Sequence, residues 1–244
     1  IAPNIKFVFE IAYQNATAFI FVSNDSIYLY QNSVKSVIST FTDSNITCAI
    51  FGPQGIVLAD TLGNIYNLST TSLQLVQVGI VPVGIPISMS LVTQSVYIGV
   101  AKIQDTSATV ADRRRIYLLN SFNYSLNELT DISWSRQIAE PEITFIYNSA
   151  TLGLIIGAYD QVNLIGRVYV YANNMLSPLS FSTSATYTYL RPDFAYFSNA
   201  SQNLYVGYSN LTNSTSAGCQ IYYAKYSANS SNVYSLGLLN DTGI

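Results

Sequence analysis

The chain has 244 residues, of which 49% are hydrophobic and only 9% are charged, whereas about 25% of the residues of an ordinary soluble domain are charged. Its formal net charge of −3 and its pI near 4.7 argue against nucleic acid as a partner, because such partners need a basic surface that neutralises phosphates. The sequence contains no His, so the commonest general base and the commonest metal ligand are both missing.

Apolar runs rich in Val, Ile, Tyr and Phe, bounded by Asn, Ser, Gly and Asp, follow one another along the chain. This pattern predicts short strands joined by turns, and no segment has the 3.6-residue period of a helix. The clearest strands are expected at about residues 6–11, 17–23, 26–30 and 34–41, then at 47–51, 56–60, 64–68 and 73–78, and near the end at 193–197, 203–208, 219–226 and 233–238.

We place one β-branched residue followed by Tyr in the third strand of each of five successive four-stranded units. The tyrosines are Tyr28, Tyr66, Tyr117, Tyr169 and Tyr222, at intervals of 38, 51, 52 and 53 residues. Such units are typical of β-propellers, whose blades pack face to face because one blade cannot bury its sheet faces alone. We therefore predict an all-β fold, a five-bladed β-propeller of four-stranded antiparallel blades. It would fill residues 1–244 as a single domain, with blades at about 1–41, 42–81, 82–133, 134–184 and 185–244. The alternative is two tandem β-sandwich domains that divide near residue 135.

Residues 81–90 read Val-Pro-Val-Gly-Ile-Pro-Ile-Ser-Met-Ser, and residues 95–100 read Ser-Val-Tyr-Ile-Gly-Val. Together they resemble the YVTN-type β-propeller repeat, and residues 203–208 resemble it more loosely. The chain lacks that repeat's Asp-Gly turn and the Asn that follows its Tyr-Val-Thr core. This family is common among archaeal surface-layer and secreted proteins, so the resemblance implies a propeller of the cell surface but carries over no binding residue.

The sequence contains ten Asn-x-Ser/Thr acceptors for N-glycosylation, and nine of them fall in predicted turns or at strand ends, where attached sugar would lie in solvent. They are Asn15, Asn24, Asn45, Asn67, Asn123, Asn199, Asn210, Asn213, Asn229 and Asn240. Only Asn67 falls within a predicted strand. We expect an extracellular or cell-surface location, with N-glycans as covalent partners and other surface proteins or copies of the chain itself as further candidate partners.

No transmembrane segment is expected in the chain. Residues 61–101 lack charge, but Pro82, Pro86 and several Gly and polar residues interrupt them, and their alternation is typical of strands.

In propellers, the loops between the second and third strands share one face with the connections between blades, and ligands usually bind there. Three of these loops are predicted to be long, and they define a candidate ligand rim. Its residues are Asp105, Asp112, Arg113, Arg114, Arg115, Trp134 and Asp160. The alternative is a solvated rim with local ion pairs. Asp105 with Asp112 or Asp160 is a weak candidate for Ca²⁺, because no spaced ligand loop accompanies the pair, so we expect neither a metal nor a cofactor.

Asp43, Glu142 and Asp193 lie near the starts of predicted first strands, where some five-bladed glycosidases carry acidic residues. Two carboxylates about 5–10 Å apart can serve as acid and nucleophile or base, but the segments around them lack the Trp and His that usually bind sugar. We assign no catalytic residue and favour a non-enzymatic surface module of an S-layer, filament or adhesive coat. The alternative is a secreted carbohydrate-binding or glycoside-hydrolysing propeller.

Cys48 and Cys219 fall in predicted blades that are not neighbours. A disulfide needs Cα atoms within about 7 Å. We therefore predict two buried thiols that act as small apolar side chains.

Overall fold

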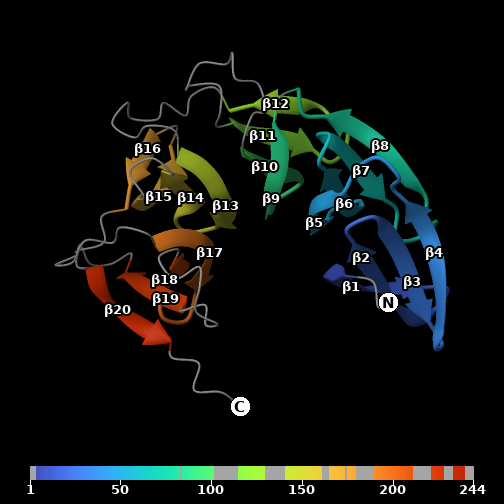
Figure 1. Cartoon of the computed structure of the whole chain (residues 1–244), viewed down its shortest axis with the longest axis horizontal. Coiled ribbons are helices and arrows are strands. Elements are labelled where there is room, and N and C mark those ends of the chain that lie inside the picture. The colour runs from blue at the N-terminus through green and yellow to red at the C-terminus, as the bar shows by residue number, and fades with distance from the viewer. Residues whose placement is uncertain are drawn as a thin grey trace. The chain divides into compact units, whose positions relative to one another are not determined.

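The computed structural model describes residues 4–82, 84–101, 115–129, 141–160, 165–173, 175–179, 190–210, 221–227 and 233–239. Within these ranges the chain forms strands and turns and no helix. The strands make five antiparallel sheets, each of four consecutive strands in chain order, as predicted (Figure 1). We call these sheets blades 1 to 5.

Blade 1 contains β1 (Ile5–Tyr13), β2 (Ala16–Ser23), β3 (Ser26–Gln31) and β4 (Val34–Thr40). Blade 2 contains β5 (Ile46–Gly52), β6 (Gly55–Asp60), β7 (Asn64–Leu68) and β8 (Leu75–Ile80). Blade 3 contains β9 (Ile85–Val92), β10 (Ser95–Ala101), β11 (Arg115–Asn120) and β12 (Leu126–Glu128). Blade 4 contains β13 (Pro141–Ser149), β14 (Gly153–Asp160), β15 (Ile165–Ala172) and β16 (Met175–Pro178). Blade 5 contains β17 (Leu190–Ser198), β18 (Asn203–Asn210), β19 (Ile221–Ser227) and β20 (Val233–Leu239).

In blade 1, two-residue turns join the first strand to the second and the third strand to the fourth. Gln14 and Asn15, between β1 and β2, have φ values of 49° and 62°, and Asn32 and Ser33, between β3 and β4, have 51° and 65°. Two successive positive φ angles define the type I′ turn, whose twist matches that of the flanking strands. Asn accepts this left-handed backbone more readily than most residues do, which fixes the register of both hairpins.

A β-bulge occurs at the same place in the first strand of every blade. One residue of that strand has no partner of its own on the second strand. These bulge residues are Lys6, Thr47, Ile87, Thr144 and Asp193. A bulge bends its strand and increases the local twist. The repeated bulge shows that the first strands of the five blades share one backbone conformation, although their side chains differ. The bulge also gives a common reference position for comparing the blades.

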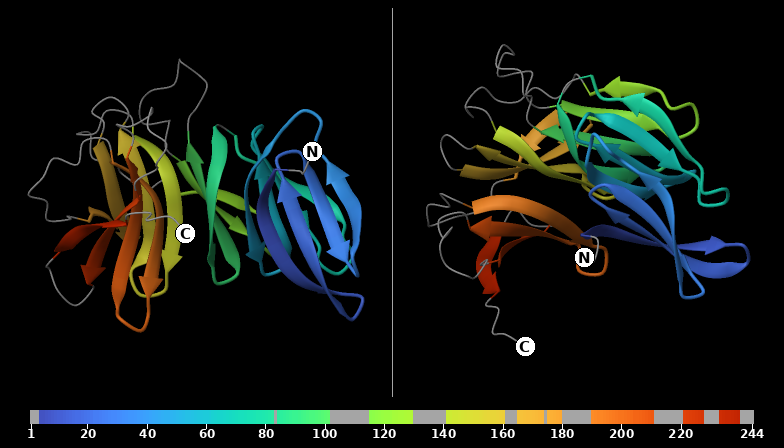
Figure 2. Two further views of the ribbon diagram at one scale, coloured as in Figure 1. Left: turned by 60° about the horizontal axis from the view of Figure 1, so that its bottom comes forward. Right: turned by 45° about the vertical axis from the view of Figure 1, so that its right-hand side comes forward.

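The chain divides into two compact units: unit 1 holds blades 1 to 3, and unit 2 holds blades 4 and 5. The sheets are twisted, and their strands are seen from two further directions in Figure 2. In unit 1, the core between blades 1 and 2 includes Ile20, Ile27, Leu29, Ile56 and Leu58. The core between blades 2 and 3 includes Val57, Ile65, Val96, Ile98 and Leu119. In unit 2, the core between blades 4 and 5 includes Phe145, Ile155, Val168, Leu204 and Val206. Each fully buried side chain of this size contributes about 1.5–3 kcal/mol.

Backbone hydrogen bonds tie blades 1 and 2 each to the connection that leads into the next blade. Phe41 N–H donates to the Asp25 carbonyl at 2.7 Å, and Val81 N–H donates to the Gly63 carbonyl at 2.8 Å. Asp25 and Gly63 lie in the turns between the second and third strands of their blades. These turns and the connections between blades therefore share one edge of the sheets in unit 1.

The repeated tyrosines all lie in third strands, one in each blade. Relative to the bulge, Tyr28, Tyr66 and Tyr169 occupy the same position. In each of these blades the residue that follows the bulge pairs with a residue of the second strand, and the tyrosine pairs with the second-strand residue that comes immediately before it in the sequence. Tyr222 departs from this pattern, because it pairs with Tyr208, which lies two residues beyond the corresponding residue, Val206. The expected equivalence of all five tyrosines is therefore wrong in blade 5, where Ala224 occupies the matching position and Tyr222 lies two residues before it.

Candidate functional site

The candidate ligand rim lies almost entirely outside the described residues. Asp105, Asp112, Arg113, Arg114 and Trp134 belong to ranges that the structure does not describe. The remaining two rim residues lie at strand ends: Arg115 is the first residue of β11, and Asp160 is the last residue of β14. Both therefore stand at the end of a blade where the second strand finishes and the third begins. The rim stays a prediction.

The carboxylates considered for catalysis take up different local environments. Asp193 is the bulge residue of β17, and its carboxylate lies 3.5 Å from Arg191 Nε, with side chains that are 35% and 44% exposed. This is the geometry of a local surface ion pair. Asp43 is exposed in the connection between β4 and β5 and accepts a hydrogen bond from Thr42 Oγ1 at 3.2 Å. Glu142 lies on β13. Within the described part of the chain, no three acidic or Cys side chains come close enough together to hold a metal ion.

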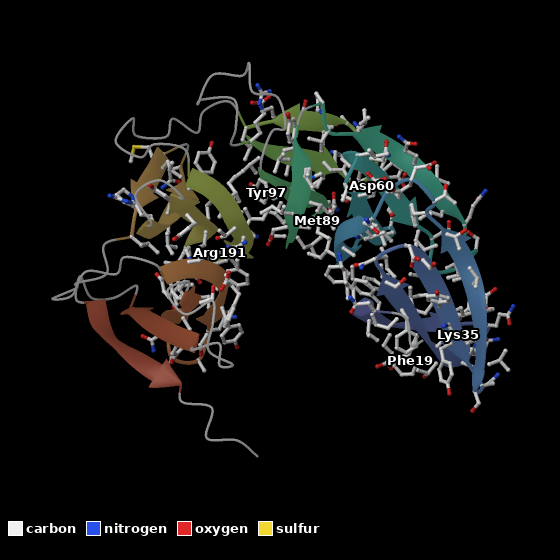
Figure 3. All side chains as sticks on the ribbon, in the orientation of Figure 1. Phe19, Lys35, Asp60, Met89, Tyr97 and Arg191 are labelled. Carbon is white, nitrogen blue, oxygen red and sulfur yellow. The ribbon has the colours of Figure 1, made fainter. Side chains whose placement is uncertain are left out.

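Asp60 is the centre of a buried polar cluster, and sequence analysis did not single it out. It ends β6 and is 0% exposed; Figure 3 labels it within blade 2. Its Oδ1 accepts the backbone N–H groups of Leu62 at 3.0 Å and Asn64 at 2.9 Å. Its Oδ2 accepts hydrogen bonds from Ser44 Oγ at 2.8 Å, Asn64 Nδ2 at 2.9 Å and Tyr66 OH at 3.1 Å.

The Asp60 cluster holds blade 2 together and leaves little capacity for a ligand. Five donors share two carboxylate oxygens, and such a buried charge is tolerated because its hydrogen bonds replace those of water. Burial raises the pKa of Tyr66 to about 12, and the neighbouring Asp60 charge adds to that rise. The cluster joins the β6–β7 turn to Ser44 in the connection that leads into the blade. The sequence signal was the Asp that precedes a Thr-Leu-Gly-Asn turn, which is typical of a side chain that caps its own turn.

The described glycosylation acceptors differ in exposure. Asn15, Asn123 and Asn199 are exposed, and each lies in a turn within one blade: β1–β2, β11–β12 and β17–β18. Asn123 Oδ1 accepts the Ser125 backbone N–H at 3.0 Å, which holds this acceptor in an Asx turn. Asn45 is also exposed, in the connection between β4 and β5.

Two further acceptors are less accessible: Asn67 is buried, and Asn24 is half-buried. Asn67 lies on β7, is 8% exposed, and donates its side-chain N–H to the Gln54 carbonyl at 3.5 Å. Asn24 Oδ1 is buried and has no hydrogen-bond partner among the described residues. Of the other acceptors, Asn210 ends β18, whereas Asn213, Asn229 and Asn240 lie outside the described residues.

Cys48 is a buried free thiol on β5, as predicted. Burial raises its pKa to about 12, against the smaller opposing effects of the Thr47 hydroxyl and the Lys6 charge. A thiol with so high a pKa is a poor nucleophile, because the thiolate is the reactive form. Cys219, the other half of that prediction, lies outside the described residues.

No known family model matches the sequence, and no curated protein is similar to it. Solved structures do share its fold. The extracellular domain of a protein described as a hybrid two-component system of B. thetaiotaomicron gives a TM-score of 0.65 at 12% identity, over 96% of this chain and 28% of that chain. An ancestral GH74 enzyme gives a TM-score of 0.64 at 12% identity, over 97% of this chain and 31% of that chain. The WD40 domain of Neurospora crassa Pan2 gives 0.57 at 10% identity, over 96% of this chain and 66% of that chain.

The chain is thus a β-propeller of four-stranded antiparallel blades, and the predicted fold class is confirmed. Tandem β-sandwiches are wrong, because each sheet consists of four consecutive strands and the matching structures are propellers. The chain spans less than a third of the length of the extracellular domain and of the GH74 enzyme. No helix among the described residues is long and apolar enough to cross a membrane.

Proposed function

We propose that this propeller is an N-glycosylated module of the cell surface or extracellular space, with a structural or interaction role in an S-layer, filament or adhesive coat. The observation that carries the proposal is the placement of its acceptors. Asn15, Asn123 and Asn199 are exposed, and each occupies a turn at the edge of its sheet. Sugar attached there would project into solvent without separating packed blade faces.

Composition and fold support the same proposal. A surface with so few charged residues has few of the groups that normally keep a protein soluble, and glycans would supply that hydration. A likeness to an extracellular domain fits a propeller outside the cell. The residues that resemble the archaeal YVTN repeat lie mainly on β9 and β10, so the resemblance falls on two paired strands of one blade.

The test is the mass of the protein isolated from its native source. We expect an intact mass above that of the bare polypeptide. Glycopeptide mapping should then locate sugar at Asn15, Asn123 and Asn199. A native protein whose mass equals that of the bare chain would overturn the proposal, because every exposed acceptor would then be empty.

The alternative is a carbohydrate-binding or glycoside-hydrolysing propeller, which the fold shared with a GH74 enzyme favours. A panel of chromogenic glycosides tests it directly. Hydrolysis that is abolished by Asp193→Asn or Glu142→Gln would establish an enzyme. Hydrolysis that survives both substitutions would show that these carboxylates are not its catalytic pair.

A further inference from the structure

The glycosylation acceptor Asn45 belongs to a segment that the fold of blades 1 and 2 holds in place. An enzyme that attaches sugar has to read three residues here, which are Asn45, Ile46 and Thr47. Asn45 is exposed in the connection between β4 and β5, whereas Ile46 begins β5 and is 0% exposed. Thr47 is the half-buried bulge residue of the same strand. The acceptor side chain therefore faces solvent, but the two residues that must accompany it are covered wholly or in part.

Blade 2 holds this segment from one side. Asn45 N–H donates to Thr61 Oγ1 at 3.1 Å, and the Asn45 carbonyl accepts Thr61 N–H at 2.9 Å. Thr47 Oγ1 donates to the Ala59 carbonyl at 3.2 Å. The hydroxyl that completes the Asn-x-Thr acceptor is therefore already bonded to the neighbouring strand, β6.

Blade 1 holds the segment from the other side. Ile46 N–H donates to the Asn24 carbonyl at 2.6 Å, and Lys6 Nζ donates to the Ile46 carbonyl at 2.8 Å. Asn24 lies in the β2–β3 turn, and Lys6 is the bulge residue of β1. The side chain of Ile46 packs in the core between blades 1 and 2. Both backbone polar groups of Ile46 and its side chain are therefore part of the contact between these two blades.

The acceptor segment at residues 199–201 is built differently. Its three residues are exposed and lie in the β17–β18 turn of blade 5. Gln202 Nε2 donates to the Asn199 carbonyl at 2.7 Å, and Ser201 N–H donates to Ser198 Oγ at 3.3 Å. These two hydrogen bonds stay within one turn. The segment can therefore change its conformation while the paired strands on either side of it remain in place.

A transferase binds the acceptor Asn and the hydroxyl two residues later in one active site, so the segment has to leave the secondary structure in which it lies. Proteases, which have the same requirement, cut at exposed loop tips. The free energy of local opening determines how much of the folded protein can react. Opening of residues 199–201 breaks the bonds of one turn, whereas opening of residues 45–47 breaks the contact between blades 1 and 2. The reactive population should therefore be much smaller at Asn45 than at Asn199.

We propose that Asn45 accepts sugar only before blades 1 and 2 pack together, whereas Asn199 remains an acceptor in the folded protein. In the transfer, Asn45 Nδ2 bonds to the anomeric carbon of an oligosaccharide carried on a polyprenyl diphosphate. The bond from that carbon to the diphosphate oxygen breaks, the diphosphate leaves with the electron pair, and Nδ2 loses one proton to a base of the enzyme. The product fits the fold, because the Asn45 side chain is exposed. The inference rests on the proposed function and adds an order of events, since sugar on Asn45 records that glycosylation preceded folding.

Transfer to the full chain in vitro tests the proposal. The chain is produced without sugar, folded, and incubated with a purified oligosaccharyltransferase and an oligosaccharyl polyprenyl diphosphate. Mass spectrometry of the glycopeptides gives the initial rates at Asn45 and Asn199. Synthetic peptides of residues 42–50 and 196–204 give the rate of each acceptor without the fold. Relative to its peptide, Asn45 should be slowed by the fold at least tenfold more than Asn199. A smaller difference would overturn the proposal.

Two lysine variants test the cause of the slow transfer. Lys6→Met removes the donor to the Ile46 carbonyl and keeps a side chain of similar length. Lys35→Met is the control, because Lys35 is in the same blade but its Nζ lies 3.7 Å from the centroid of the Tyr28 ring. In the folded chain, Lys6→Met should raise the rate at Asn45 at least threefold, and Lys35→Met should leave it unchanged. Equal effects would overturn the proposal. If circular dichroism shows that Lys6→Met has lost its strands, Thr61→Val takes its place, because it removes the acceptor of the Asn45 N–H.

The outcomes separate this inference from the proposed function. Native protein in which every acceptor is empty would defeat the proposed function but would not change the rates measured in vitro. Transfer to Asn45 of the folded chain as fast as to its peptide would defeat this inference, and the exposed turns would still be open to glycosylation.

Discussion

Phe145 and Phe194 each lie directly over a glycine of the neighbouring strand, Phe145 over Gly157 and Phe194 over Gly207. A Cβ atom added to either glycine would stand 2.2 Å from the phenylalanine ring. The two arrangements differ in burial, since Phe145 is 5% exposed and Phe194 is 53% exposed. The Phe145 ring is therefore held in place by the core of blade 4, whereas the Phe194 ring of blade 5 has room to move.

This difference predicts unequal effects of the same substitution. Gly157→Ala should lower the free energy of unfolding by about 1–3 kcal/mol, because the buried ring of Phe145 cannot yield without disturbing the core. Gly207→Ala should cost less than about 1 kcal/mol, because Phe194 can turn into solvent. Urea unfolding of both variants measures the two effects. Equal losses would show that exposure of the ring does not decide the outcome.

The Asp60 cluster predicts a large effect from an isosteric change. Asp60→Asn replaces one acceptor oxygen by an NH₂ group that must face donors, so at least two of the donors lose their partner. We expect a loss of about 2–3 kcal/mol in the free energy of unfolding. Asp43→Asn is the control, because Asp43 is exposed; it should change stability by about 0.5 kcal/mol or less. A small effect at both positions would contradict a structural role for the buried carboxylate.

Tyr66 makes the stability of unit 1 sensitive to alkali. Its pKa rises from 10.0 to about 12 in the folded chain. The folded state therefore holds this proton more tightly than the unfolded state, and the resulting stabilisation is complete below pH 10 and is lost as the pH rises towards 12. Tyr66→Phe should remove this part of the decline. Unfolding measured across that range would show parallel curves for both proteins if Tyr66 did not contribute.

Cys48 should resist alkylation in the folded protein. Its pKa is raised to about 12, so almost no thiolate is present near neutral pH, and the side chain is 4% exposed. Iodoacetamide at pH 8 should modify Cys48 only as fast as the chain unfolds, and labelling in concentrated urea gives the reference rate. Mass spectrometry of the peptide that contains Cys48 follows both reactions. Rapid modification without denaturant would contradict its burial.

The positions of the strands could be predicted from the sequence, because alternating apolar residues and turn residues determine the local conformation of the chain. Tyr28, Tyr66 and Tyr169 were correctly predicted to be equivalent for this reason. The bulges could not be predicted, because they have no common side-chain chemistry: Lys6 and Ile87 occupy equivalent positions. A bulge is set by the backbone of the paired strand, so only the paired register reveals it.

The polar cluster of blade 2 was missed for a related reason. Asp60 and the turn that follows it are adjacent in the sequence, but Ser44 precedes Asp60 by 16 residues. Such a contact depends on how the entering connection crosses the end of the sheet. The exposed acceptors, by contrast, lie in turns as expected, because type I′ and Asx turns favour Asn for its backbone conformation and its side-chain oxygen.

Asn67 should remain free of sugar in the folded protein, whereas Asn15 should carry it. Asn67 is 8% exposed, its amide donates to the Gln54 carbonyl, and its Oδ1 lies 3.3 Å from where a Cβ on Gly55 would stand. A glycan on this nitrogen would have to displace the β5–β6 turn, whereas Asn15 sits at the exposed tip of the β1–β2 turn. Asn15→Gln should therefore lower the native mass by one glycan and leave stability unchanged within about 0.5 kcal/mol. Asn67→Gln should leave the glycan mass unchanged and lower the free energy of unfolding by about 1 kcal/mol or more, since a longer amide cannot occupy the same buried space. A glycopeptide that contains modified Asn67, recovered from folded protein, would contradict this assignment.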